Sequence, residues 1–308
     1  MHSIVVSCIA VVLTVLTLLS WELSNSWQVW WLVVTVCLVG VPHGGLDHWA
    51  GRSLFFPFAG KLWLPLFMIC YLSVGVVVVA GWLVSPLTTI LVFFALSASH
   101  FGIEEDGSKQ QKSRFDSLSR FAIGGMVIWI PTATQPEAVE SIMSSLVPNE
   151  LRTQAIIACQ ATACSAWFFA PIVVLSWMIY AKEQPLVAFR LAAFAILFST
   201  ASPIVSFMVY FCGWHSIRGL TQLRVMHSGT SLEFARSIVP LSLGAIALAI
   251  PIHFLVGQHV SLTQNILRTT FVALSAIAIP HLVLHVVADS YRVRGTDEVF
   301  PQVGGALQ

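Results

Sequence analysis

The sequence contains few charged residues, and this absence excludes most classes of soluble protein. Only 9% of its 308 residues are Asp, Glu, Lys or Arg, whereas 57% are hydrophobic. A typical soluble domain is about 25% charged, and a soluble fold of this length cannot cover so much apolar surface. Repeated apolar stretches of about 20 residues are typical of transmembrane helices. The composition therefore predicts an all-α, polytopic transmembrane helix bundle.

The signatures of several other protein classes are also missing. The net charge is +1 and no long basic cluster occurs, which argues against a nucleic-acid partner. The six cysteines are scattered and form no CxxC pair of the metal-binding type. Neither GxGxxG nor a Walker motif occurs, so no nucleotide site is expected. The first apolar run lacks a basic n-region and a small-residue cleavage site, and we interpret it as a retained helix.

Ten apolar segments suggest ten helices. A count of eight or nine also fits, because one segment is short and residues 187–218 are divided mainly by "STASP". We expect residues 1–290 to form one transmembrane domain and 291–308 a tail, with residues 136–160 lying along the outer interface. The ten segments are 3–21, 30–47, 62–84, 86–102, 120–134, 165–181, 187–201, 202–218, 238–256 and 269–287.

The distribution of Lys and Arg predicts the orientation of these segments. Thirteen of the 15 basic residues follow an even-numbered segment, which leaves only Arg152 and Arg268 on the other side. Basic residues concentrate in cytoplasmic loops. Both termini are therefore predicted to be cytoplasmic, in a multi-pass protein of the cell (inner) membrane.

Five histidines fall at one end of segments that run in the same direction. They are His43, His100, His215, His281 and His285. A single such histidine is most simply an interior residue bonded to a backbone carbonyl, but four segments that deliver imidazoles to one depth are harder to explain by packing. Neutral imidazoles can hold a divalent metal in a membrane at modest electrostatic cost. Such a site suits iron, copper or zinc, and suits magnesium or calcium poorly.

Three neighbours of these histidines are further candidates. Asp47 shares a helical face with His43 if the helix continues through the two glycines, and it could then accept the second ring N–H of a ligand. The alternative is that Asp47 meets water or pairs with Arg52. Phe101 and Trp214 each adjoin a histidine and are the aromatic candidates for a substrate pocket.

Four short motifs, in this order across nearly the whole chain, carry a family resemblance. "GVPHGGLD", "SASHFGIEED", "YFCGWHSIRG" and "AIPHLVLH" resemble the Brp/Blh family of β-carotene 15,15′-dioxygenases. The resemblance implies an integral membrane enzyme that uses O2 to split β-carotene at its central double bond into two retinals. It implies a ferrous ion held by histidines, here His43, His100, His215 and His281. It also implies a functional link to a retinal-binding rhodopsin.

One position departs from the family pattern. The family's HSxRH motif ends in a histidine, and this sequence has Gly219 there. Either His281 or His285 fills the vacant position, or the protein supplies only three ligands. A divergent member with a changed substrate or lost activity is a further alternative. A transporter is the non-enzymatic one, although transporters more often place ionisable pairs at the bilayer midplane, and here the polar residues gather toward one surface.

Overall fold

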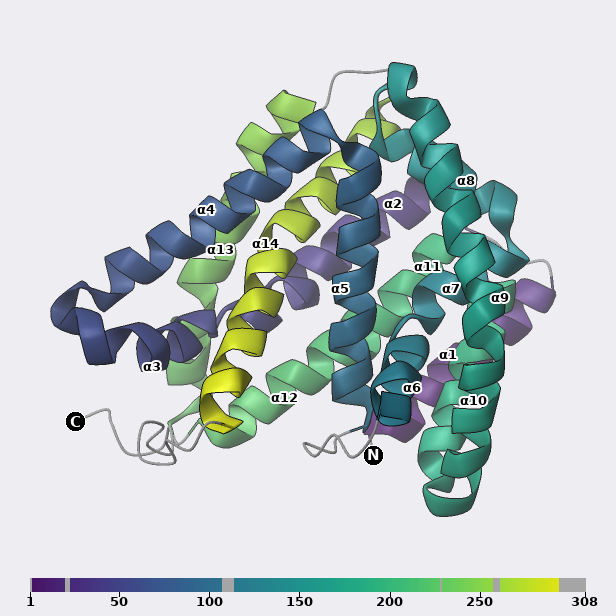
Figure 1. Ribbon diagram of the computed structural model, residues 1–308, viewed down its shortest axis with the longest axis horizontal. Coiled ribbons are helices and arrows are strands. Elements are labelled where there is room, and N and C mark those ends of the chain that lie inside the picture. The colour runs from purple at the N-terminus through teal and green to yellow at the C-terminus, as the bar shows by residue number, and fades with distance from the viewer. Residues whose placement is uncertain (1, 20–22, 107–113, 228, 257–260, 294–308) are drawn as a thin grey trace.

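The structure is a computed structural model, and it describes residues 2–19, 23–106, 114–227, 229–256 and 261–293. All regular secondary structure in these ranges is helical, and the helices form one bundle (Figure 1). The α-helices are α1 (His2–Leu18), α2 (Asn25–Thr35), α3 (Asp47–Ala59), α4 (Trp63–Val84), α5 (Pro86–Asp106), α6 (Arg114–Gly124), α7 (Met126–Thr134), α8 (Pro136–Leu146), α9 (Arg152–Glu183), α10 (Pro185–Thr200), α11 (Pro203–Phe207), α12 (Ile217–Met226), α13 (Ser231–Val256) and α14 (Leu262–Val293). Shorter segments are the π-helices η1 (Val36–Gly40) and η5 (Met208–Ser216) and the 3-10 helices η2 (Pro42–Gly44), η3 (Gly60–Leu62) and η4 (Asn149–Leu151).

Prolines set several of the helix boundaries. Four helices begin at Pro86, Pro136, Pro185 and Pro203. Proline fits the first helical turn, where its missing N–H leaves no bond unmade, and it forces the preceding residue out of the helical conformation. The break predicted at "STASP" is confirmed, because α10 ends at Thr200 and α11 begins at Pro203.

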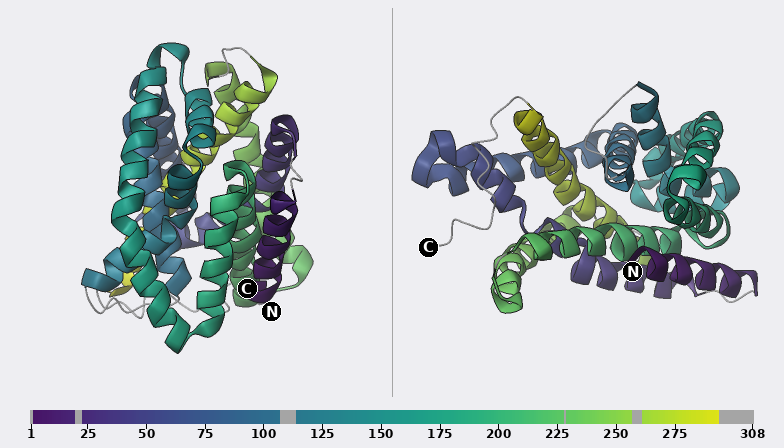
Figure 2. Two further views of the ribbon diagram at one scale, coloured as in Figure 1. Left: turned by 90° about the vertical axis from the view of Figure 1, so that its right-hand side faces the viewer. Right: turned by 90° about the horizontal axis from the view of Figure 1, so that it is seen from below.

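Several helices are long and apolar enough to cross a membrane, as the composition predicted. Within the described ranges, five stretches meet that description, and α1 and α10 are apolar but shorter. The five are Asn25–Val84, Pro86–Ile103, Asn149–Glu183, Ser231–Val256 and Leu262–Ala288. The all-α fold is therefore confirmed, while the count of ten crossings stays a prediction. The start of α1 and the end of α14 lie at the same end of the molecule (Figures 1 and 2).

The predicted segment 30–47 is wrong in its second half. The helix α2 gives way to η1, and the chain then leaves the helical path through η2 and Leu46, which has φ −103° and ψ 10°. The predicted connector begins at residue 48, but residues 47–59 form α3. Gly60 ends α3 at φ +53°, a left-handed conformation that glycine adopts without steric cost.

Two further segments differ from expectation. Residues 120–134 are not one helix, because the chain breaks at Gly125 between α6 and α7. Residues 136–160 do not form a single interfacial segment. They divide into α8, whose apolar face is buried inside the protein, and the start of α9. Residues 294–308, most of the predicted tail, lie outside the described residues.

Close contact between α5 and α6 fixes the helix that carries His100. A Cβ at Gly102 would overlap the backbone of Arg120, and one at Gly124 would overlap the backbone of Ala98. Glycines at such positions let two helix backbones approach closely. The pair therefore holds the end of α5 against its neighbour.

Candidate metal centre

Two π-helical segments face each other at the base of the site. The segment η1 ends just before His43, and η5 contains His215. π-helical turns are rare and are frequently found at functional sites. The segments approach closely at Gly40, where a Cβ would stand 2.9 Å from the Phe211 ring. This approach brings the ring centroids of His43 and His215 to 4.9 Å.

Histidines from α5 and α14 complete a ring of four imidazoles. The centroid of His100 lies 5.1 Å from that of His215 and 5.6 Å from that of His281. The centroids of His281 and His43 are 5.2 Å apart, which closes the ring. Neighbouring planes are inclined by 73° to 79°. The structure thus brings together all four histidines that the sequence predicted as ligands.

The spacings of neighbouring rings fit pairs of imidazoles that bind one metal ion. A metal–nitrogen bond of about 2.1 Å places a ring centroid about 3.2 Å from the ion. Two such rings have centroids about 4.5 Å apart at a ligand angle of 90°, and about 5.2 Å apart at the tetrahedral angle. Three of the observed spacings, 4.9 to 5.2 Å, lie within this range, and the 5.6 Å between His100 and His281 lies slightly beyond it. The donor set of neutral nitrogens suits iron, copper or zinc.

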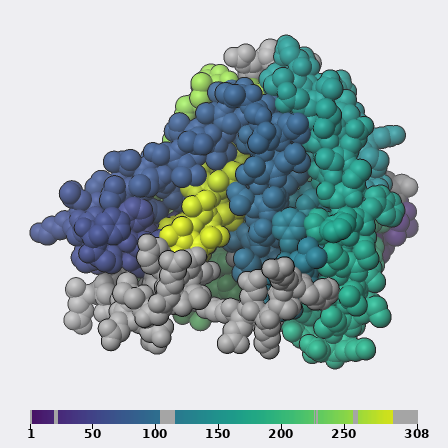
Figure 3. Space-filling view, in the orientation of Figure 1, coloured from purple at the N-terminus to yellow at the C-terminus, as the bar shows by residue number. Residues whose placement is uncertain are grey.

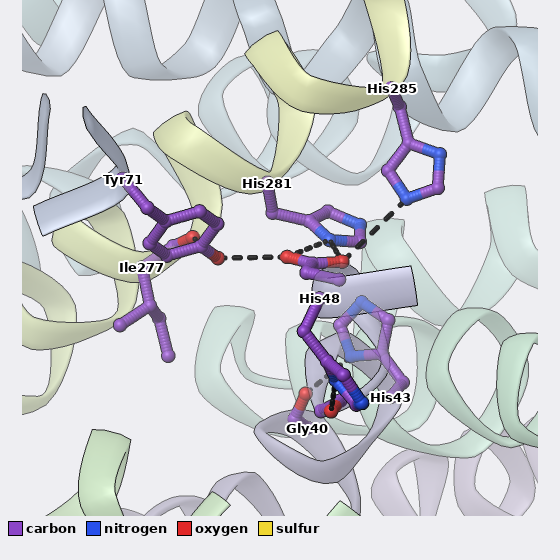
Figure 4. A network of polar contacts seen from close by, with 9 residues as sticks. Gly40, His43, His48, Tyr71, Ile277, His281 and His285 are labelled. Atoms are coloured by element: carbon purple, nitrogen blue, oxygen red, sulfur yellow. Dashed lines mark hydrogen bonds and ion pairs between the residues drawn. The ribbon is translucent and has the colours of Figure 1, made fainter. Parts of the chain in front are cut away.

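Hydrogen bonds select which ring nitrogen is left for a ligand on two of the histidines. Nδ1 of His43 donates to the carbonyl of Gly40, and Nδ1 of His281 donates to the Asp47 carboxylate at 2.7 and 2.9 Å (Figure 4). Carbonyl and carboxylate oxygens only accept, so Nδ1 carries the proton in a neutral ring. Nε2 is then the unprotonated nitrogen in both rings. Outer hydrogen bonds of this kind fix the tautomer of metal-binding histidines.

The sequence did not predict the helix position from which Asp47 contacts His281. It is not on a continuous helix with His43, because η2 interrupts the helix, and it is instead the first residue of α3. Its buried carboxylate accepts from His281 and, at 2.8 Å, from the hydroxyl of Tyr71 on α4. The Tyr71 hydroxyl is also 3.1 Å from the carbonyl of Ile277. Arg52, the alternative partner of Asp47, lies over the ring of Phe56.

His285, the alternative fourth ligand, lies beside the ring of four. Its ring centroid is 4.4 Å from that of His281 and 6.3 Å from that of His100, and its side chain is 47% exposed. Its Nε2 is 3.8 Å from Asp47. Asp47, His281 and His285 also place one ligand atom each within 4.8 Å of one another, so these three could hold a metal. The two hydrogen bonds that Asp47 already accepts favour its role as a partner of His281 instead.

An apolar cavity of about 800 Å³ begins at the four histidines. Its walls come from α4, α5, α7, α8, α11, α13 and α14, with the histidines at one end. Phe101, the first aromatic candidate, lines this cavity, and its ring centroid is 4.9 Å from that of His215. A long cavity that ends at a ring of imidazoles can present an apolar ligand to a bound metal.

Trp214, the second aromatic candidate, is not among the residues that line this cavity. Its ring stacks on His2 at 5.3 Å, and the guanidinium groups of Arg190 and Arg218 lie over it at 4.1 and 5.3 Å. Adjacent residues of a helix point in different directions, so when His215 faces the other imidazoles its neighbour faces α1 and α10.

Sequence reasoning missed Tyr71 and Phe211. Tyr71 is one of only four tyrosines and lies in an apolar segment, where its hydroxyl needs a partner. The need of this hydroxyl for a partner was the signal in the sequence that could have identified Tyr71 as a site residue. Phe211 precedes His215 by one turn, and its ring stacks on the imidazole at 5.6 Å. Nothing in the sequence separates it from the many other phenylalanines.

The fold and the site together define a class: an all-helical protein of apolar helices, with a cluster of histidines at the end of an apolar cavity. Comparison with known proteins places the chain within that class. The chain belongs to the beta-carotene 15,15′-dioxygenase family, which matches residues 34–289 and so includes the four clustered histidines, His285 and Asp47. The resemblance drawn from the short motifs is confirmed.

Two curated relatives illustrate the similarity. A protein of an uncultured marine bacterium named beta-carotene 15,15′-dioxygenase is 24% identical over 267 residues, covering 83% of this chain and 92% of the relative. A Halobacterium salinarum protein named probable beta-carotene 15,15′-dioxygenase Blh is 20% identical over 289 residues, covering 82% and 81%. No solved structure matches the chain.

Proposed function

We propose that the chain is a membrane-embedded, non-haem iron dioxygenase that cleaves β-carotene or a related carotenoid at the central 15,15′ double bond to give retinal. The observation that carries this proposal is the ring of four imidazoles at the end of an apolar cavity of about 800 Å³. Cavities of about 300–1,000 Å³ are typical ligand sites. The names of the two relatives support the reaction.

In this proposal His43, His100, His215 and His281 hold Fe(2+). Asp47 orients His281 through Nδ1, and the Gly40 carbonyl does the same for His43. Ferrous iron, when bound, supplies the redox chemistry that makes dioxygen reactive toward a double bond. No residue beyond the ligands is needed as an acid or base, because the overall reaction transfers no proton to or from the protein.

The chain's own contribution is to bind the polyene and exclude water. Phe101 and Phe211 flank the His215 ring, and the remaining cavity walls are largely apolar. The cleavage balances without a reductant: one carbon–carbon double bond breaks, and each of its carbons receives one oxygen atom of O2. Holding a single double bond beside the metal then decides which bond is cut.

The membrane arrangement is part of the proposal. Residues 1–290 form a single transmembrane domain of about ten crossings, with both termini and the 291–308 tail on the cytoplasmic side of the cell membrane. The start of α1 and the end of α14 lie at one end of the molecule in Figure 1, which supports placing both on the same side of the membrane. The retinal produced is available to a retinal-binding rhodopsin in the same membrane.

Expression in cells that make β-carotene tests the proposal. We expect the wild type to bleach the orange colour and to form retinal, detected by chromatography, and we expect His43→Ala to form none. Persistent colour without retinal from a well-expressed wild type would overturn the dioxygenase proposal. Such a result with iron still bound would instead favour a divergent family member, the alternative that Gly219 raises.

A further inference from the structure

The wall of the cavity is buried or half-buried except along two helices. Among the described lining residues, those that are exposed lie only on α4 and α13, four on each. They are Leu72, Val76, Ala80 and Leu83 on α4, and Gly244, Leu248, Pro251 and Leu255 on α13. These eight residues, which we call the seam, line the cavity and the outer surface at once.

The spacing of the seam residues shows that they form two continuous stripes. On each helix they recur at intervals of three or four residues, which places them on one helical face. Each stripe covers twelve residues, or eleven steps of 1.5 Å, which is about 16 Å of helix. The helices α4 and α13 each pack along α14 rather than along each other (Figures 1 and 2). The cavity therefore reaches the surface through an elongated opening between them.

The chemistry of the seam suits a ligand dissolved in lipid. No seam residue is charged or polar, and Val76 is 67% exposed. The helix α13 presents its apolar surface outward: only 11% of its apolar window is buried, against 56% for α14. In a bilayer this opening would face hydrocarbon, where a polar solute is not available to enter.

The space beside the first seam residue of α13 is open. A Cβ built at Gly244 meets no atom within 4 Å. A substitution at this position therefore has room for its first side-chain atom.

We propose that the seam between α4 and α13 is a lateral entrance, through which a long apolar polyene passes from the lipid bilayer to the histidines. The substrate class rests on the proposed function, whereas the entrance itself rests on the exposed lining residues. A rod-like hydrocarbon lying along the seam can move sideways into the cavity without crossing water.

Matched substitutions test the entrance. Gly244→Trp and Val76→Trp place an indole in the seam, and Gly244→Ala is the small control. Val77→Trp is the second control, because Val77 is 69% exposed on the same helix but does not line the cavity. Each iron-free variant is reconstituted in liposomes that contain β-carotene or, separately, the polyene hydrocarbon diphenylhexatriene. Bound probe is measured by absorbance after timed capture of the protein, and thermal unfolding reports folding.

We expect both seam tryptophans to slow the uptake of either probe about tenfold or more, while the two controls stay within about twofold of the wild type. Uptake at the wild-type rate by folded Gly244→Trp and Val76→Trp would overturn the entrance, as would a wild type that takes up neither probe. Uptake of diphenylhexatriene but not β-carotene by the wild type, blocked by the seam tryptophans, would support the entrance and contradict the proposed substrate.

Discussion

Two histidines on opposite sides of the site, His281 on α14 and His215 on η5, have different surroundings. His281 donates a short hydrogen bond to Asp47, which Tyr71 supports in turn. His215 is buried against the aromatic rings of Phe101 and Phe211, on a π-helical segment that Trp214 helps to anchor.

A hydrogen bond and aromatic packing determine different properties of a histidine ring. A hydrogen bond to Nδ1 determines which nitrogen carries the proton, and therefore which one is left for a metal. Aromatic packing fixes the plane of a ring and stabilises the protein, but it does not select a tautomer. We therefore expect changes on the α14 side to alter metal affinity, and changes on the η5 side away from the imidazole to alter stability.

Removal of a ligand on either side has the largest expected effect. We expect His281→Ala and His215→Ala to lose bound iron and retinal formation alike, because three imidazoles hold a divalent ion far less tightly than four. Iron per chain and retinal yield are the measurements. His253→Ala is the control, since His253 bonds Thr269 and does not line the cavity. If either ligand variant kept full iron occupancy, the ring of four would not be the site.

Asp47→Asn tests the hydrogen bond between Asp47 and His281 alone. The amide keeps the size of the side chain but loses the charge that pairs with His281. We expect iron affinity, measured by competition with a chelator, to fall about 10- to 100-fold, the usual effect of losing such an outer partner. Unchanged affinity would show that the orientation of His281 does not depend on this contact.

Tyr71→Phe removes one of the two donors to Asp47. A hydrogen bond to a charged group contributes about 1.5–3 kcal/mol, but His281 continues to hold the carboxylate. We expect a loss of iron affinity smaller than that of Asp47→Asn and in the same direction, in the same chelator competition. A loss equal to or larger than that of Asp47→Asn would instead assign Tyr71 a direct role at the metal.

Trp214→Phe tests the aromatic contacts of the η5 segment that carries His215. The phenyl ring is a weaker partner for Arg190 and Arg218, and cation–π contacts contribute about 0.5–2 kcal/mol. We expect a lower unfolding midpoint in detergent, with iron affinity unchanged within about twofold. A loss of iron affinity on the scale of Asp47→Asn would remove the distinction between the two sides.

Gly219→His has the smallest expected effect. A Cβ there would lie 3.8 and 3.9 Å from His43 atoms, in ordinary contact, so the variant has room for its first side-chain atom. Because His281 already supplies a fourth imidazole, we expect iron affinity to change less than about threefold. A rise of tenfold or more would show that no existing residue substitutes fully for the family's second histidine.

The sequence predicted the all-α fold and the identity of the clustered histidines, because both follow from local pattern. The length of an apolar run predicts a helix that can cross a membrane. The positions of four histidines at the same end of such runs predict that they lie close together; these are His43, His100, His215 and His281. The partner of Asp47 could not be predicted, because the contact joins residues 234 positions apart. The break at η2 determines it, and that break has no reliable signature in "VPHGGLD".

The π-helical segments explain a second feature of the site that the sequence could not predict. Trp214 and His215 are neighbours, and only the local helical geometry decides which of them faces the cavity. A single inserted residue in a helical turn rotates every later side chain. Of the two residues chosen for their position next to a histidine, Phe101 therefore lines the cavity and Trp214 is not among the lining residues.

Iron content of the purified, anaerobically loaded protein tests the central claim most directly. We predict about one ferrous ion per wild-type chain, and background iron in the alanine variants of His43, His100, His215 and His281. His285→Ala should retain the metal, because His285 lies outside the ring of four. A wild type that binds no iron, or iron lost in His285→Ala but kept in any of the four, would contradict the account.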